Sequence, residues 1–169
     1  MLKLMGAALL VGGCGAVGFS AAGRLARRVG VLRALVGALE GMERELSFRL
    51  TPMPELLERA AESPPPVGEL FARCRARLGE LGERSLSQLW REAVADTPLD
   101  LTGGERLALE ELGDVLGRYD GEEQRSALAR TRAELSRALE QAREETEKQG
   151  RMYRALGLTA GALLAILLL

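Results

Sequence analysis

The chain has 169 residues, enough for one domain of ordinary size, and its 23 basic and 24 acidic side chains leave a net charge of −1. This charge balance and an aromatic content of 4% argue against a nucleic-acid-binding surface, which needs positive potential or stacking platforms. The absence of histidine and the wide separation of the two cysteines, Cys14 and Cys74, argue against a zinc site or a disulfide framework.

The first predicted element is an apolar run at the N-terminus. No charged residue occurs from Leu4 to Gly23, and a helix of this length spans a hydrocarbon core of about 30 Å. The sequence therefore predicts a transmembrane helix over residues 1–23. Small residues recur every four positions and predict a face for close helix packing: Ala8, Gly12, Ala16 and Ser20, with Cys14, Gly18 and Ala22 beside them.

Three other patterns in this run suggest different roles for it. Lys3, the apolar stretch and Ser20-Ala21-Ala22 have the layout of a cleavable signal peptide, although arginines would then flank the exported domain. Val11-Gly12-Gly13-Cys14 resembles a lipoprotein cleavage box, but no polar tether follows it. Residues 13–18 fit G-x-G-x-x-G, the pattern of a dinucleotide-binding turn, yet no strands are predicted downstream to build the required sheet.

One long helix is predicted to continue from this span to residue 50. Its apolar stripe steps by three and four, and is formed by Leu25, Val29, Leu32, Val36, Leu39, Met42, Leu46 and Leu50. Pro52 and Pro54 forbid simple continuation, and Thr51 is predicted to cap the next helix.

Short helices are predicted next, separated by a corner at Ser63-Pro64-Pro65-Pro66 and by two capping boxes at 85–88 and 102–105. Cys74 is expected to be a buried small side chain, because no histidine exists to activate it, and Trp90 is expected to anchor the core. The predicted inward residues are Leu56, Leu57, Ala60, Ala61, Val67, Leu70, Phe71, Cys74, Leu78, Leu86, Leu89, Trp90, Ala93, Val94, Leu109, Leu112, Leu116 and Tyr119.

The last predicted helix starts at a cap formed by Asp120 and Glu123 and contains no proline up to the C-terminus. Leu128, Leu135, Leu139 and Ala142 share one face of it. Residues 141–149 are nearly all polar, which fits either a stalk or an ordinary solvated helix.

A second, shorter apolar run from Ala155 to Leu169 predicts another transmembrane helix over residues 151–169. Basic residues lie on the inner side of both runs, whereas Lys3 lies outside the first. They are Arg24, Arg27, Arg28, Arg33, Lys148, Arg151 and Arg154. Ala, Leu, Glu and Arg dominate the chain and every predicted element is a helix, so the sequence predicts an all-α protein. The positive-inside rule then predicts that its helical domain, residues 24–150, is cytoplasmic and that its two termini lie across the membrane.

Several segments, in this order and spacing, resemble the stage III sporulation protein AB family. They are Met1-Leu2-Lys3-Leu4, Leu-Thr-Pro-Met-Pro-Glu at 50–55, Ser-Leu-Ser-Gln-Leu-Trp at 85–90, Leu-Gly-Arg-Tyr-Asp at 116–120 with Gln124, and a charged helix entering an apolar tail. The likeness covers essentially the whole chain. Within it, two corners provide candidate partner-binding positions: Thr51, Pro52 and Pro54 after the first long helix, and Gly117, Asp120 and Gln124 before the last one.

The resemblance implies a helical domain like those of the inner-membrane platform proteins of type II secretion and type IV pilus machines. It further implies a place in a secretion-like channel complex between mother cell and forespore, in the mother-cell or outer forespore membrane. The expected partners are other channel subunits and a cytosolic secretion-type ATPase, with homo-oligomerisation left open. No catalytic residue, cofactor, metal or small-molecule substrate is expected. The alternatives are a membrane-organising helical protein without a motor partner and, less favoured, a nucleotide-binding protein that uses residues 13–18.

Overall fold

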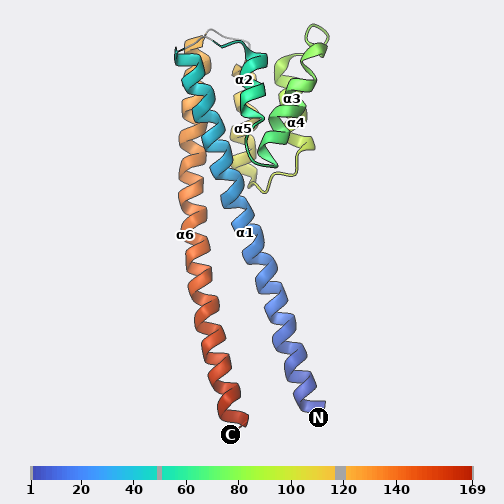
Figure 1. Ribbon diagram of the computed structural model, residues 1–169, viewed down its shortest axis with the longest axis vertical. Helices are drawn as coiled ribbons and strands as arrows, with labels where there is room; N and C mark the ends of the chain where they lie inside the picture. The colour runs from blue at the N-terminus through green and yellow to red at the C-terminus, as the bar shows by residue number, and fades with distance from the viewer. Residues whose placement is uncertain (1, 49–50, 117–120, 169) are drawn as a thin grey trace. The chain divides into compact units, whose positions relative to one another are not determined.

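The structure is a computed structural model, and it describes the backbone of residues 2–48, 51–116 and 121–168. Side chains are described for residues 23–48, 51–116, 122–150 and 152. Figure 1 shows the labelled helices of the chain, coloured by residue number. The chain divides into two compact units, of which the first contains residues 1–27 and 141–169 and the second contains residues 28–140.

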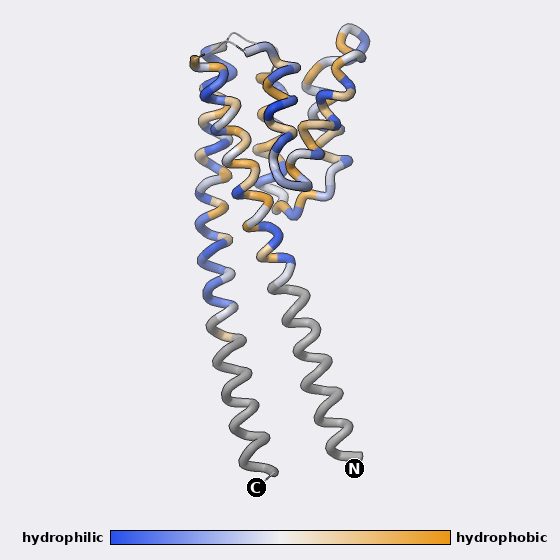
Figure 2. The backbone as a smooth tube through the Cα atoms, in the orientation of Figure 1, coloured by the Kyte–Doolittle hydropathy of each residue, from blue (hydrophilic) through white to orange (hydrophobic). Residues whose placement is uncertain are grey.

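Two long helices carry most of the chain. Helix α1 spans Leu2–Phe48 and helix α6 spans Gly121–Leu168. Each runs without interruption from one unit into the other, as the absence of proline from both segments predicts. Along the described part of α6, hydrophobic and hydrophilic residues alternate first and then become nearly all hydrophilic towards Gly150 (Figure 2).

Between the long helices, the described residues 51–116 form four short α-helices and one 3₁₀ turn. They are α2 (Met53–Ala60), α3 (Val67–Ala76), η1 (Leu78–Glu80), α4 (Leu86–Asp96) and α5 (Gly103–Val115). Within the second unit, α2 packs on α3, α3 on α4 and α4 on α5. The described parts of the chain contain no β-strand, so the predicted all-α class is confirmed.

Both predicted capping boxes are present, and they fix where α4 and α5 begin. The Ser85 hydroxyl accepts the backbone N–H of Gln88, whose side chain accepts the N–H of Ser85. Thr102 and Glu105 make the same reciprocal pair of bonds at α5. Each box supplies acceptors for donors that the first helical turn would otherwise leave without partners.

Trp90 anchors the core of the second unit, as predicted. Its side chain is fully buried, and its indole N–H donates to the carbonyl of Leu109 at 2.7 Å. The ring lies 5.6 Å from that of Phe71, at a tilt of 53°. Trp90 thereby links α4 to both α3 and α5. Nearly all predicted inward residues of these helices are buried, whereas Ala61, Leu78 and Leu86 are half-buried and Tyr119 lies outside the described residues.

The predicted buried face of α1 is partly wrong. Leu32, Leu39 and Met42 are buried as expected, but four other members of the predicted stripe are only half-buried: Leu25, Val29, Val36 and Leu46. Leu50 lies outside the described residues. Buried positions that the prediction omitted are Val31, Leu35 and Ala38. The reason is that α1 has several neighbours. Its side chains form ion pairs with α2, α5 and α6, so the buried arc is wider than one apolar stripe.

Thr51 does not cap α2, contrary to the prediction. Its hydroxyl donates to the carboxylate of Glu45 at 3.0 Å, and the residue before the helix is Pro52, whose side chain makes no capping bond. Pro54 has no N–H, so the first turn of α2 has one donor fewer to satisfy, while a carboxylate is a strong acceptor for the hydroxyl.

Among the residues whose side chains are described, no helix combines the length and hydropathy needed to cross a membrane. The two predicted spans, 1–23 and 151–169, lie almost entirely outside those residues. The same holds for Gly12, Ala16 and Ser20, so the small-residue packing face stays a prediction.

Candidate functional site

Small residues form a row along the part of α1 that belongs to the second unit. Gly30, Ala34, Gly37 and Gly41 follow one another at steps of four and three, so they lie on one side of the helix. A methyl group added at any of the three glycines would meet no neighbouring atom within 4 Å. This side of α1 is therefore open, and its backbone can be approached closely.

Helix α2 stands beside this row and is held to α1 by ionic contacts. The Arg59 guanidinium pairs with Glu45 of α1 at 2.5 Å and with Glu55 of its own helix at 2.8 Å. These two carboxylates raise the pKa of Arg59, first through the hydrogen bond to Glu55 and then through the charge of Glu45. Glu45 also accepts the Thr51 hydroxyl, so one carboxylate joins α1, the connecting corner and α2.

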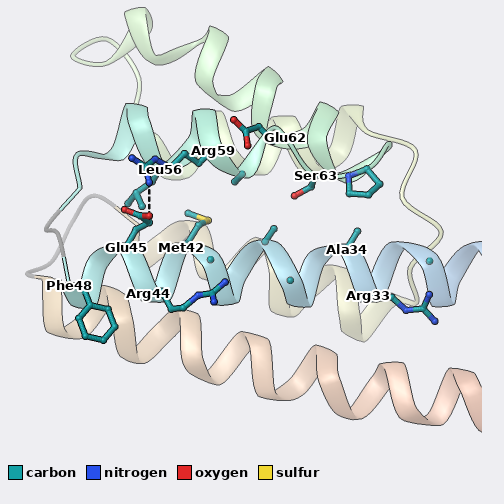
Figure 3. A pocket seen from close by; sticks show the side chains of 16 residues that line it. Arg33, Ala34, Met42, Arg44, Glu45, Phe48, Leu56, Arg59, Glu62 and Ser63 are labelled. Atoms are coloured by element: carbon teal, nitrogen blue, oxygen red, sulfur yellow. Dashed lines mark hydrogen bonds and ion pairs between the residues drawn. The ribbon is translucent and has the colours of Figure 1, made fainter.

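The space between these elements is a groove of about 860 Å³, named here the α1–α2 groove (Figure 3). Its floor is the small-residue row of α1 with Ala38 and Met42, and its far wall comes from Leu56, Ala60 and Pro64. Phe48 is the last apolar residue that α1 contributes to the groove, and 84% of its surface is exposed. An aromatic ring left this open beside an apolar floor is a feature of interaction surfaces.

The rim of the groove carries charges of both signs. Arg33 and Arg44 lie on α1, and Glu62 lies beyond the end of α2 (Figure 3). All three side chains are exposed, and none has a hydrogen-bond or ion-pair partner in the part of the chain that the structure describes. In contrast, Arg59 and Glu45 neutralise each other within the groove. The edge of the groove formed by α1 is consequently positive, and the opposite edge carries one negative group.

The candidate positions predicted from the sequence divide into two sets. Thr51, Pro52 and Pro54 lie at the corner between α1 and α2, where Thr51 is buried and holds Glu45 in place. Gln124 is half-buried near the start of α6. The other two positions of its corner, Gly117 and Asp120, lie outside the described residues, as does the predicted Asp120 cap.

A second, smaller cavity of about 500 Å³ lies near Pro54. Ala61, Ala72, Ala76, Leu78, Gly79 and the stem of Arg75 form the rest of its lining. Arg75 pairs with Glu58 at 3.1 Å, so this cavity presents no unpaired charge among its lining residues. It offers fewer features for recognition than the α1–α2 groove.

Cys74 has no reactive character. The side chain is fully buried on α3, and this burial raises the pKa of the thiol to about 11, which the charge of Arg77 opposes only in part. A thiol with so little thiolate at neutral pH is a poor nucleophile. The expectation that Cys74 is a small core residue is confirmed.

None of the residues that line the groove is among the partner-binding positions predicted from the sequence. The sequence contains the signal, because small residues at helical spacing lead up to Phe48. Whether this face is open depends on the place of α2 beside α1, and the spacing alone does not give that place.

In the part of the chain that the structure describes, these features define an all-helical fold with two long helices, four short α-helices between them in the sequence, and an open groove suited to protein contacts. The family model described as stage III sporulation protein AB matches residues 3–169. Stage III sporulation protein AB of Bacillus subtilis (strain 168) is 34% identical over 176 residues, an alignment that covers 100% of both chains. A solved structure of stage III sporulation protein AB (SpoIIIAB) is similar with a TM-score of 0.64 and 25% identity, over 72% of this chain and 97% of that one. The chain therefore belongs to the stage III sporulation protein AB family.

Proposed function

We propose that this protein is a non-enzymatic adaptor subunit of a sporulation-specific, secretion-like complex. It is anchored in the membrane at both ends, and its helical domain docks a cytosolic secretion-type ATPase. The α1–α2 groove is the observation that supports this role. It is apolar at the floor, charged at the rim and open along its length, which are properties of a protein-docking surface.

Family membership supports the sporulation context of the proposal. The likeness of this family to secretion and pilus platform proteins adds an analogy for the motor partner, and an analogy at the level of fold is a weaker support than a site. The mechanism that we propose is positional. Two anchors keep the helical domain next to the bilayer, so that a soluble motor binding to it is held at the membrane.

The motor partner is tested by co-expressing the full-length chain with the secretion-type ATPase from the same organism. Membranes are solubilised in mild detergent, and the chain is captured through an affinity tag. We expect the ATPase to co-purify in a stable ratio. Absence of the ATPase both in detergent and in intact membrane vesicles would overturn the docking role.

The anchors are tested separately, by carbonate extraction of membranes from cells that make the full-length chain. We expect the protein to remain in the pellet. A chain shortened to residues 24–150 serves as the control and is expected in the supernatant. Release of the full-length chain by carbonate would contradict the predicted anchors while leaving the docking role open.

A further inference from the structure

The α1–α2 groove has features that specify the shape of its occupant. The positions Gly30, Ala34, Gly37, Gly41, Arg44 and Phe48 follow one another at steps of 4, 3, 4, 3 and 4. This repeat is the spacing at which a second helix can lay its own ridges against a first. Because the floor has almost no side chains, the backbone of such a helix can come close. An extended strand has no matching periodicity.

The charges of the rim specify the polarity of the occupant. Arg33 and Arg44 are separated by eleven residues, which is about three turns or about 16 Å along the helix, and they lie on the same side of α1. Both guanidinium groups lack a partner in the described parts of the chain. A helix that placed carboxylates at the same spacing along one of its edges would pair with both of them.

A second copy of this chain does not fit these charges. If two α1 helices met in parallel through this face, each of the two arginines would approach its own counterpart, and like charges would repel. If they met antiparallel with residues 37 and 41 at the centre, Arg33 would face Glu45. The carboxylate of Glu45 is already bonded to Arg59 and Thr51. A partner of different sequence is therefore favoured.

We infer that the α1–α2 groove receives one amphipathic helix of another protein, an assignment that rests on the docking role proposed above. The apolar face of this helix lies on the glycine and alanine row and covers Phe48. One edge carries acidic residues that pair with Arg33 and Arg44, and the opposite edge faces Glu62 and favours a basic residue. The charges thus fix which edge of the helix lies on which side of the groove.

The first test uses two synthetic peptides and the full-length chain in mild detergent. One peptide is an amphipathic helix of about 20 residues with glutamates at the spacing of Arg33 and Arg44, and its twin carries lysines at those two positions. Binding is followed by fluorescence anisotropy. We expect the glutamate peptide to bind at least about tenfold more tightly than its twin. The double variant Arg33→Glu/Arg44→Glu is expected to reverse this preference.

Two further variants separate the floor of the groove from its rim. Gly37→Leu fills the floor and is expected to weaken both peptides, whereas Gly103→Leu adds the same side chain at an open position on α5 and leaves binding unchanged. Arg130→Glu, an exposed site on α6, controls for the change of charge. Equal binding of the two peptides, or unchanged binding to Gly37→Leu, would overturn the inference.

The second test asks where the ATPase binds, and its result separates the two proposals. We expect Gly37→Leu and the double arginine variant to lose capture of the ATPase, whereas the controls Gly103→Leu and Arg130→Glu keep it. This result would support the groove as the binding site of the ATPase. Undiminished capture by these variants overturns the groove assignment and leaves the docking role intact. If the ATPase fails to bind the wild-type chain while the peptide pattern holds, the ATPase is excluded as the partner, and the groove remains a docking site for an acidic amphipathic helix of another protein. Disulfide-linked dimers of Gly41→Cys, made in a Cys14→Ser background, would instead identify a second copy as the occupant and overturn the assignment.

Discussion

Gly113 lies directly against the indole of Trp90. A methyl group at this position would approach Cδ1 of Trp90 to 2.3 Å and its Cγ to 2.8 Å. Trp90 cannot move away freely, because it is fully buried and its ring nitrogen donates to the carbonyl of Leu109. Helix α5 can therefore pack this closely against α4 only because residue 113 is a glycine.

Gly113→Ala is expected to lower the free energy of unfolding by about 1–3 kcal/mol, the usual cost of overpacking a core. This loss exceeds the gain in helix propensity of up to about 1 kcal/mol. The full-length chain in mild detergent is unfolded with denaturant and followed by the fluorescence of Trp90, the only tryptophan of the sequence, and by circular dichroism. Gly41→Ala is the matched control, because its methyl group meets open space, and it should be neutral or stabilising. Equal stability of Gly113→Ala and the wild type would contradict the close packing.

The ion pair between Arg28 and Glu105 predicts a dependence of stability on pH. Burial alone would raise the pKa of Glu105, but hydrogen bonds from Arg28 and from the N–H of Thr102, with the charge of Arg28, hold that pKa below its ordinary value. Ionised Glu105 therefore stabilises the fold above its unfolded pKa of about 4.3, and this contribution disappears as pH falls through the lower folded value.

Glu105→Gln tests this dependence, because glutamine can still complete the capping box. We expect the stability difference from the wild type to be largest at neutral pH and to shrink below about pH 4. Arg28→Met should act in the opposite sense. In this variant Glu105 stays buried but has lost the Arg28 guanidinium, so the pKa of Glu105 is higher than in the wild type. The variant therefore loses stability as pH increases. Glu122→Gln, in an exposed pair with Arg125, is the control and should change little at any pH. Parallel pH profiles for wild type and Glu105→Gln would refute the assigned role.

Cys74 is expected to react slowly with thiol reagents in the folded protein. The thiol is buried, and its pKa of about 11 leaves little thiolate at pH 8. In a Cys14→Ser background, modification by Ellman's reagent should be at least about a hundredfold slower than in denaturant, since reaction needs local opening. The control moves the thiol two residues along α3, as Ala72→Cys with Cys74→Ala, to an exposed position that should react rapidly. Similar rates for the two positions would show that α3 is not packed as described.

The capping box at the start of α4 predicts a measurable loss of stability when it is broken. Ser85→Ala removes the acceptor for the backbone N–H of Gln88 and is expected to cost about 1 kcal/mol. Ser85→Asp should retain most of the stability, because its carboxylate can accept the same bond. Ser126→Ala, at an exposed site on α6, controls for the loss of a hydroxyl and should change stability by less than about 0.5 kcal/mol. A loss as large for Ser126→Ala as for Ser85→Ala would count against the cap.

Much of the fold could be predicted because its signals are local. The starts of α4 and α5 follow from reciprocal bonds between residues three apart, and the end of α1 follows from two prolines close in sequence. The buried face of α6 was predicted correctly, since Leu128, Leu135 and Leu139 repeat with the period of a helix. These features depend on neighbours within one or two turns of the chain.

The groove and the burial of α1 could not be predicted in the same way. Whether Gly37 faces a neighbour or open space depends on the position of α2. That helix packs through its buried residues Leu56, Leu57 and Ala60, and the Arg59–Glu45 ion pair links it to α1. Thr51 shows the same difficulty at smaller scale. Its sequence context suits a helix cap, but a carboxylate supplied by the preceding helix takes its hydroxyl instead.

Glu105 performs two tasks with one carboxylate, since it completes the cap of α5 and pairs with Arg28 of α1, 77 positions earlier. The start of helix α5 is thereby coupled to the Arg28–Glu105 ion pair. Forming this pair closes a long loop of the chain, which costs conformational entropy. During synthesis, α1 leaves the ribosome well before its acidic counterpart exists. The ion pair that links α1 to the start of α5 can therefore form only after residue 105 has emerged.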